Sequence, residues 1–583
     1  MNSSIILCIF CILCVIPASY LVTLTPKATT TEGPVVGFVD QVQGRKVYNF
    51  YGIPYAKPPV GQLRFAKTVA VEARKDVYEA ISYSSDCYHF VDDLRDINIP
   101  ISEDCLYLNI ITTEDAFMGK DKAKRHVMFY IHGGGFTRGS GTQYPFLSQT
   151  LVSTQDIVLV THNYRLDVFG FIYHEKMPEF RGNYGLWDQN MALRWVKNNI
   201  AHFGGDPNQI TIFGESVGGL STFMHIASPY ASGLFNRAIP MSAVPLLLED
   251  EANYRTSLSS EIVLKRSGCM DAKDKLICLR SIPAEQLALM VPLRELPFGV
   301  VYNSEYVPVK ESQLFLNGSY SNDVDVMVGL AEEDASFFFS YISVVPYIKQ
   351  NLTYRDGLQV IGLSFKPEAV NQVAQWYLGD PKKVSSYDIQ QGLIQIANDI
   401  SFGVAYEVAR RNAVQQRVGK TYGWLLTRAP KVNFQVMCFL DKDFGVCHED
   451  ILIYVFGVPF DKAGFYKDSD RLLSAQLMDV WGNFAKTGKT LWAPWKVSGN
   501  GNSDTPLAYF EPSKDGKSSF EIGQNPAKRI IERFDFFKKN LLPKLFGFDK
   551  YPIQQQIPID KKSDRRKYWP IYLPYLTTEH FYY

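Results

Sequence analysis

The sequence lacks an excess of charge of either sign, and this excludes two large classes of partner. Its 583 residues contain 60 Lys and Arg against 60 Asp and Glu. A chain without net charge has no field that draws it to nucleic acid or to an anionic membrane surface. We therefore expect no nucleic-acid partner.

Long hydrophobic runs are also missing after the first residues, so no membrane span is expected. An apolar run extends from Ile5 to Pro17 and is followed by Ala18 and Ser19. This run is too short to cross a bilayer and is typical of a signal peptide over residues 1–19, although no Lys or Arg precedes it. A signal anchor is the alternative. The C-terminus is not a lipid-anchor tail, and we expect a secreted, extracellular protein.

None of the six cysteines that follow residue 19 has a partner at zinc-type spacing, so the sequence supports no metal site. Three of the nine cysteines lie in the signal peptide, and the other six are Cys87, Cys105, Cys269, Cys278, Cys438 and Cys447. An even count after a signal peptide predicts disulfide bonds. Asn317 and Asn351 begin glycosylation sequons, which fit a secreted glycoprotein.

Linkers, low-complexity tracts and repeats are missing as well, which predicts one large domain over residues 35–545. Residues 20–34 are Thr-rich and are expected to form a short leader. Residues 546–583 combine Lys and Arg with many Tyr and Pro, and are expected to form a C-terminal tail of unassigned role.

What the sequence does contain is an alternation of buried strands and helical patterns. Short apolar runs predict strands over 126–131, 156–164, 209–214 and 325–330, and apolar residues at helical spacing predict a helix over 189–205. Such alternation predicts an α/β fold with a mostly parallel sheet covered by helices. In such sheets, catalytic groups lie in loops at the carboxyl ends of the strands.

A nucleophile motif follows the strand predicted over 209–214. The motif G-x-S-x-G spans Gly214, Ser216 and Gly218, and residues that can form a helix come next. A strand, a tight turn and a helix form the nucleophile elbow of serine hydrolases, which exposes the serine above the sheet. The alternative is a turn serine with a structural role only.

A run of three glycines follows the strand predicted over 126–131. The segment HGGGF covers residues 132–136, and no phosphate-loop motif is present. Ester hydrolysis builds negative charge on the former carbonyl oxygen, which backbone N–H groups stabilise. The glycine run supplies such donors, and a further one is expected from Val217, the residue after the nucleophile.

The chain resembles the type-B carboxylesterase and cholinesterase family of the α/β-hydrolase fold. The similarity extends over residues 35–545, through the blocks FYGIPYAKPPVGQLRF (50–65), SEDCLYLNI (102–110), IHGGGF (131–136), NYRLDVFGF (163–171), GNYGLWDQNMALRWVKNNIAHFGGDPNQITIFGESVGG (182–219) and GVCHEDILIYVFG (445–457). The resemblance implies a secreted serine hydrolase that cleaves small-molecule carboxylic esters by two-step acyl transfer without a cofactor or metal.

The same resemblance implies the catalytic residues. It places a Ser–acid–His triad at Ser216, Asp334 and His448, with Glu333 as the alternative acid. Asp334 stands where the family usually has Glu. The implied oxyanion hole consists of the backbone N–H groups of Gly134, Gly135 and Val217, and Val217 replaces the usual Ala.

Structural pairs also carry over from the family. The resemblance implies the disulfides Cys87–Cys105 and Cys269–Cys278, and the ion pairs Arg64–Glu103 and Arg165–Asp188. Two alternatives remain for Cys438 and Cys447: they form a disulfide that braces the loop of His448, or both stay reduced.

Two departures bear on function. Cholinesterases have a Trp where this chain has Arg95, and a cation there would repel choline, so we expect choline esters to be poor substrates. Relatives often carry an acid three residues after the histidine, where this chain has Ile451, with Glu449 and Asp450 earlier.

Some relatives are adhesion proteins that usually lack a triad member, so an inactive or weakly active binding protein is the alternative function.

Overall fold

The computed structural model describes residues 23–88, 99–120, 122–243, 249–291, 298–308, 322–336, 352–364, 367–399, 419–433, 445–494, 507–510 and 521–523. Several sequence predictions concern residues outside these ranges: the signal peptide, the C-terminal tail, Arg95, Cys438 and the sequons at Asn317 and Asn351. Among the described residues, no helix combines the length and apolarity that a membrane crossing needs.

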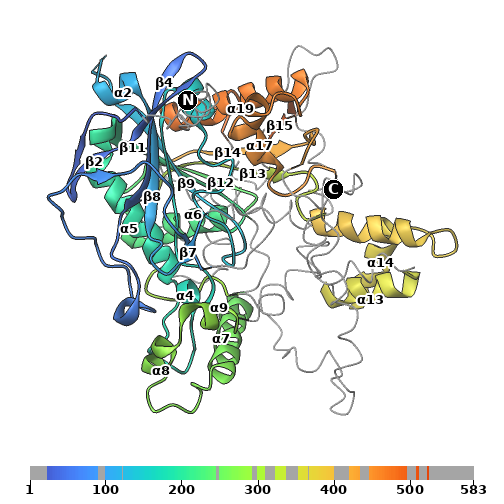
Figure 1. Ribbon diagram of the computed structural model, residues 1–583. Helices are drawn as coiled ribbons and strands as arrows, with labels where there is room; N and C mark the ends of the chain where they lie inside the picture. The colour runs from blue at the N-terminus through green and yellow to red at the C-terminus, as the bar shows by residue number, and fades with distance from the viewer. Residues whose placement is uncertain are drawn as a thin grey trace, which may run out of the picture.

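A large mixed sheet forms the centre of the molecule (Figure 1). Its strands, in spatial order, are β16 (Glu521–Gly523), β15 (Leu507–Phe510), β14 (Thr421–Leu426), β13 (Asp325–Ala331), β12 (Arg237–Met241), β11 (Gly205–Glu215), β9 (Arg125–Ile131), β10 (Val158–His162), β8 (Tyr107–Thr113), β4 (Arg45–Pro54) and β3 (Phe38–Val42). In this order, neighbouring strands from β15 to β10 are parallel, whereas β8, β4, β3 and β16 pair in antiparallel fashion at the two ends.

Two small sheets lie beside the large one. β1 (Ala28–Thr30), β2 (Gly33–Val36) and β5 (Tyr78–Glu79) form one, and β6 (Asp86–Cys87) with β7 (Ile101–Ser102) forms the other. The described helices are α2 (Glu114–Met118), α3 (Gln149–Gln155), α4 (Asp167–Phe171), α5 (Tyr184–Asn199), α6 (Val217–Ala227), α7 (Glu249–Arg266), α8 (Lys275–Ser281), α9 (Ala284–Ala288), α13 (Tyr354–Ser364), α14 (Pro367–Tyr377), α17 (Asp450–Val455), α18 (Val458–Asp461) and α19 (Asp468–Thr487), with 3₁₀ turns at η1 (Gly61–Leu63), η2 (Ile200–Phe203) and η3 (Pro229–Ala231).

The parallel strands are buried on both faces, which explains their continuous apolar runs. Along β9, Phe129 and Ile131 belong to one hydrophobic cluster and Met128 and Tyr130 to the other, because successive side chains point to opposite faces. Helices α5 and α6 contribute to the first cluster, and α3, α17 and α19 to the second. Figure 1 shows the two groups of helices on opposite sides of the sheet.

The predicted elements are present with shifted ends. The four predicted strands correspond to β9, β10, β11 and β13. The helix predicted over 189–205 instead begins at Tyr184, directly after a left-handed Asn183, and ends at Asn199. A 3₁₀ turn continues to Phe203, and Gly204 ends it with a φ of 85°.

This topology gathers the predicted site at one edge of the sheet. Ser216 follows β11, the glycine run follows β9, Asp334 follows β13, and His448 lies after β14 and shortly before α17. The first three leave the carboxyl ends of parallel strands, where α/β enzymes place their catalytic groups, and His448 contacts Asp334 there.

Candidate active site

Ser216 occupies a strained turn between β11 and α6. Its φ of 58° and ψ of −125° lie outside the regions that residues other than glycine prefer. The turn is held by the Ser216 N–H, which donates to Met241 O at 3.0 Å, and by Ser216 O, which accepts from Leu220 N at 2.9 Å. The backbone therefore fixes the serine at the N-terminus of α6, in the geometry of a nucleophile elbow.

The glycines on either side of Ser216 are required by close packing. A Cβ on Gly218 would lie 2.1 Å from Ile131 O, and a Cβ on Gly214 would lie 2.4 Å from Gly218 O. No larger residue fits at either position without a shift of the backbone. The spacing of the G-x-S-x-G motif thus follows from the way this turn packs against the end of β9.

The glycine run after β9 forms a fixed loop beside the nucleophile. A Cβ on Gly133 would lie 3.1 Å from Ser216 Cβ, so this loop passes directly next to the serine. Gly134 has a φ of 104°, which favours glycine, and its carbonyl accepts from Arg138 N at 3.0 Å. The loop is held from outside by Tyr164 Oη, which donates to His132 O at 2.9 Å.

His448 is paired with Asp334 rather than with Glu333. The Nδ1 atom of His448 lies 2.7 Å from Asp334 Oδ1, and both side chains are 2% exposed. Glu333 instead accepts a hydrogen bond from Val446 N at 2.8 Å. Burial raises the pKa of Glu333 to about 7. Of the two candidate acids, Asp334 therefore contacts the imidazole and Glu333 contacts the backbone of Val446.

The Asp334 carboxylate has partners for both of its oxygens. Besides the contact of Oδ1 with His448, Oδ2 accepts from Ser242 Oγ at 2.5 Å and from Ala331 N at 3.1 Å. Ser242 N also donates to Gly329 O at 2.8 Å, which ties the end of β12 to β13. These bonds fix the direction in which Asp334 faces the imidazole.

A second buried carboxylate lies on the other side of the imidazole. Glu215 Oε1 is 3.2 Å from His448 Nε2, and Glu215 is fully buried. Burial raises the pKa of Glu215 well above its ordinary value. Burial lowers the pKa of His448, but the neighbouring carboxylates of Glu215 and Asp334 outweigh burial and raise it above its ordinary value. The site therefore favours the protonated imidazole that forms when histidine accepts a proton.

Asp450 holds the loop that carries His448. Its Oδ2 atom accepts from Cys447 N at 2.8 Å and from Asn433 Nδ2 at 2.6 Å. Cys447 is disulfide-bonded, which excludes the reduced alternative for this residue; its suggested partner, Cys438, lies outside the described residues. Ile451, at the position where relatives often have an acid, is fully buried in the apolar cluster that includes α17 and α19.

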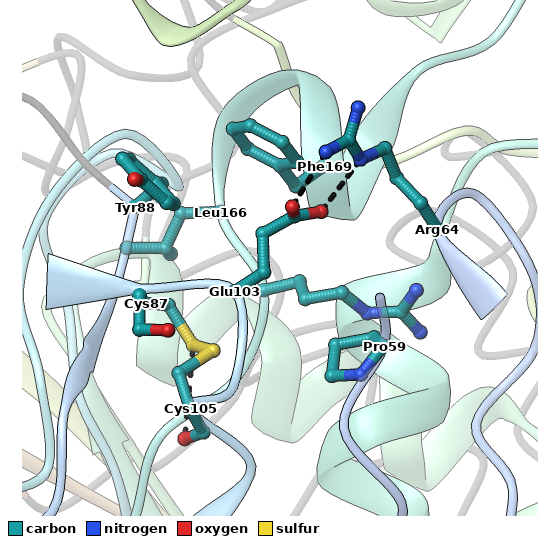
Figure 2. A pocket seen from close by; sticks show the side chains of 10 residues that line it. Pro59, Arg64, Cys87, Tyr88, Glu103, Cys105, Leu166 and Phe169 are labelled. Carbon is teal, nitrogen blue, oxygen red and sulfur yellow. Dashed lines mark hydrogen bonds and ion pairs between the residues drawn. A yellow bond between two sulfur atoms is a disulfide. The ribbon is translucent and has the colours of Figure 1, made fainter. Parts of the chain in front are cut away.

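The predicted structural pairs are present. The disulfides Cys87–Cys105 and Cys269–Cys278 are formed, and Arg165 binds Asp188 through Nε at 2.7 Å. Arg64 Nη2 lies 2.6 Å from Glu103, and Figure 2 shows this ion pair beside the Cys87–Cys105 bridge, in the wall of a small cavity. No residue of the predicted triad or oxyanion hole lines that cavity, so it is separate from the site described above.

Sequence reasoning missed two supporting residues. Ser242 holds Asp334 and belongs to no motif with a recognised mechanism, whereas Asp450 lies in the block over residues 445–457 but the sequence assigns it no role. Ser242 comes directly after β12 and has a φ of 49°, a backbone conformation that no local sequence signal predicts. The only available hint was its position at the carboxyl end of a strand.

Known proteins resemble this chain over most of its length. The model of the carboxylesterase family matches residues 24–533. Acylcarnitine hydrolase of Rattus norvegicus is 33% identical over 544 residues, which cover 89% of this chain and 91% of that protein. Acylcarnitine hydrolase of Mus musculus is 32% identical over 490 residues, covering 79% of this chain and 83% of that protein. Acetylcholinesterase of Electrophorus electricus is 30% identical over 539 residues, which cover 80% of this chain and 82% of that protein.

These matches confirm the resemblance found in the sequence and the predicted α/β-hydrolase fold. The family match extends over most of the chain, and relatives above 30% identity align along most of their own length. The relatives named above are carboxylic ester hydrolases, and the chain belongs to the carboxylesterase family, which has the α/β-hydrolase fold.

Proposed function

We propose that the protein is a secreted esterase that cleaves small-molecule carboxylic esters through Ser216, His448 and Asp334. The observation that carries this proposal is the buried His448–Asp334 contact of 2.7 Å, formed at the same sheet edge as the strained turn of Ser216. No cofactor or metal takes part in the reaction.

In the first step, His448 takes the proton of Ser216 and Ser216 Oγ attacks the ester carbonyl. Asp334 orients the imidazole through Nδ1 and stabilises its protonated form. The N–H groups of Gly134, Gly135 and Val217 stabilise the charge on the tetrahedral oxygen. The protonated histidine then gives its proton to the leaving alcohol.

In the second step, water replaces the alcohol. His448 accepts a proton from this water, which attacks the acyl-enzyme and releases the acid. The bond between Ser216 Oγ and the acyl carbon breaks, and Ser216 recovers its proton from His448. The site thus returns to its starting state.

The location and the substrate class follow from different observations. The two disulfides fit an oxidising compartment, which supports secretion after loss of residues 1–19 and glycosylation at Asn317 and Asn351. The names of the relatives point to acyl esters of carnitine and of choline. Arg95 disfavours a quaternary ammonium, so we place uncharged esters ahead of both.

The test is hydrolysis of p-nitrophenyl esters of graded acyl length by the purified secreted protein. We expect turnover that falls at least about 10⁴-fold in Ser216→Ala, because no other group replaces the nucleophile. Turnover that persists in Ser216→Ala would contradict the proposal. A wild-type protein that hydrolyses none of the esters would favour the alternative of a binding protein.

A further inference from the structure

The carboxyl group of Glu215 faces the interior of the active site without a hydrogen bond. Neither of its oxygens has a hydrogen-bond partner among the described residues, although the residue is fully buried. Oε1 lies 3.2 Å from His448 Nε2, and a Cβ on Gly133 would lie 2.9 Å from Oε2. Glu215 therefore points into the space between the histidine and the glycine loop. The imidazole of His448 is a charged neighbour of this carboxyl group, but with no hydrogen bond on either oxygen its burial remains costly, and it can accept a further ligand.

Glu449 brings a second carboxylate to the same place. It follows His448 directly, has a φ of 71° and is 8% exposed. Neighbouring side chains in an extended segment point apart, whereas this left-handed residue turns the chain. One ligand atom from each of Glu215, His448 and Glu449 lies within 4.8 Å of the other two.

An imidazole nitrogen and two carboxylates form a donor set that zinc accepts. Two ligands of a tetrahedral zinc ion, each bound at about 2.0–2.1 Å, are roughly 3.3 Å apart. The Nε2–Oε1 distance of 3.2 Å matches this separation. In addition, His448 faces Asp334 through Nδ1 at 2.7 Å, and a carboxylate on the second nitrogen is the usual partner of a zinc-bound histidine.

We propose that Glu215, His448 and Glu449 form a binding site for Zn²⁺ or a similar transition-metal ion, and that an ion bound there inhibits the enzyme. The ion takes the Nε2 lone pair that would otherwise accept the proton of Ser216. Metal binding and ester hydrolysis are therefore mutually exclusive. The binding site is independent of the proposed function, whereas the inhibition rests on it.

Binding is tested without turnover, in the Ser216→Ala variant, which keeps all three ligands. Co²⁺ titrated into this protein is expected to give the visible absorption bands of a four- or five-coordinate ion, and EDTA is expected to abolish them. Adding Glu449→Gln or Glu215→Gln to Ser216→Ala is expected to weaken Co²⁺ binding at least tenfold. Unchanged bands in both double variants, or no bands in Ser216→Ala itself, would contradict the proposal that these residues bind a metal ion.

Inhibition is tested in the wild-type protein with Zn²⁺ alone. We expect Zn²⁺ to reduce hydrolysis of p-nitrophenyl acetate, EDTA to restore it, and Glu449→Gln to raise the half-inhibiting concentration at least tenfold. The matched control is Glu261→Gln, which removes the carboxylate 3.2 Å from His174 Nε2 and should leave the inhibition unchanged.

The two experiments separate the two claims. If Co²⁺ binds through Glu449 but Zn²⁺ leaves hydrolysis intact, the inhibitory role is wrong. A weakening by Glu261→Gln that matches that of Glu449→Gln would place the inhibitory ion elsewhere and overturn the proposal. If the wild-type protein hydrolyses no ester, the proposed function fails, while the Co²⁺ titration still decides the metal site.

Discussion

Two buried carboxylates flank His448, and they differ in how they are held. Asp334, after β13, faces Nδ1 at 2.7 Å, and its other oxygen accepts hydrogen bonds from Ser242 and Ala331. Glu215, at the end of β11, lies 3.2 Å from Nε2 and has no hydrogen-bond partner among the described residues. A carboxylate that is held by hydrogen bonds can orient a neighbouring group, whereas one that makes no hydrogen bond can interact with a molecule or ion that enters the site.

The largest effect is expected at Asp334, the carboxylate that is held by hydrogen bonds. Asp334→Asn should lower kcat by about 10⁴-fold, because an amide no longer holds the imidazole in the productive tautomer. The measurement is steady-state hydrolysis of p-nitrophenyl acetate. Glu333→Gln is the matched control and should stay within a few-fold of wild type, because Glu333 contacts Val446 N rather than the imidazole. If Glu333→Gln abolishes turnover and Asp334→Asn does not, the assignment of the acid is reversed.

A smaller effect is expected on the other side of the imidazole. Glu215→Gln keeps the shape of the side chain but removes the charge beside Nε2. An opposite charge at this distance is worth about one to three pKa units, so we expect kcat/KM to fall by about 10-fold to 10³-fold. A loss as large as that of Asp334→Asn would show that Glu215, and not Asp334, is the principal partner of the histidine.

Ser242→Ala removes one hydrogen bond from the Asp334 carboxylate and thus tests how much that hydrogen bond contributes to holding Asp334. Loss of a hydrogen bond to a buried charged group costs about 2 kcal/mol, and we expect this loss in the free energy of unfolding. We also expect kcat to fall about tenfold, since Asp334 stays in place but is less firmly held. Denaturant titration and steady-state kinetics measure the two quantities. Unchanged kinetics would mean that the Ala331 N–H alone orients Asp334.

The smallest effect concerns Glu333, and it depends on pH. Burial raises the pKa of Glu333 from its ordinary value of 4.5 to about 7 in the folded protein. The folded state therefore binds this proton more tightly than the unfolded state, so the protonated group contributes stability that is lost as pH rises from 4.5 to 7. Glutamine does not titrate.

The stability of Glu333→Gln relative to wild type should thus increase over this pH window and level off above it. The measurement is the free energy of unfolding of both proteins by denaturant titration at several pH values. A difference that stays constant across the window would show that Glu333 is not held as a buried acid.

Much of the fold and of the candidate site could be predicted from the sequence, because both depend on local patterns. The parallel strands are buried on two faces and therefore read as continuous apolar runs, and the glycines beside Ser216 are required by contacts within one turn. The resemblance to a family then placed His448 and Asp334, which lie far apart in the chain. Family membership is confirmed, and the catalytic roles of these residues stay predictions.

The contacts that support the site could not be predicted in the same way. Ser242 and Asp334 are 92 positions apart, and their hydrogen bond depends on the register of β12 and β13. The convergence of Glu215 and Glu449 on His448 depends on a left-handed backbone at Glu449 and on the packing of two loops. The spacing of the six cysteines after residue 19 gives no support for a zinc site, and a site built from carboxylates and a histidine has no signature of this kind in the sequence.

The central claim is that Ser216 is the nucleophile of this site. The most direct test is to treat the wild-type protein with an organophosphate probe and to locate the adduct by mass spectrometry of its peptides. We expect a single adduct on Ser216 that is absent in Ser216→Ala and slower to form in Asp334→Asn. An unlabelled wild-type protein, or labelling that persists in Ser216→Ala, would contradict it.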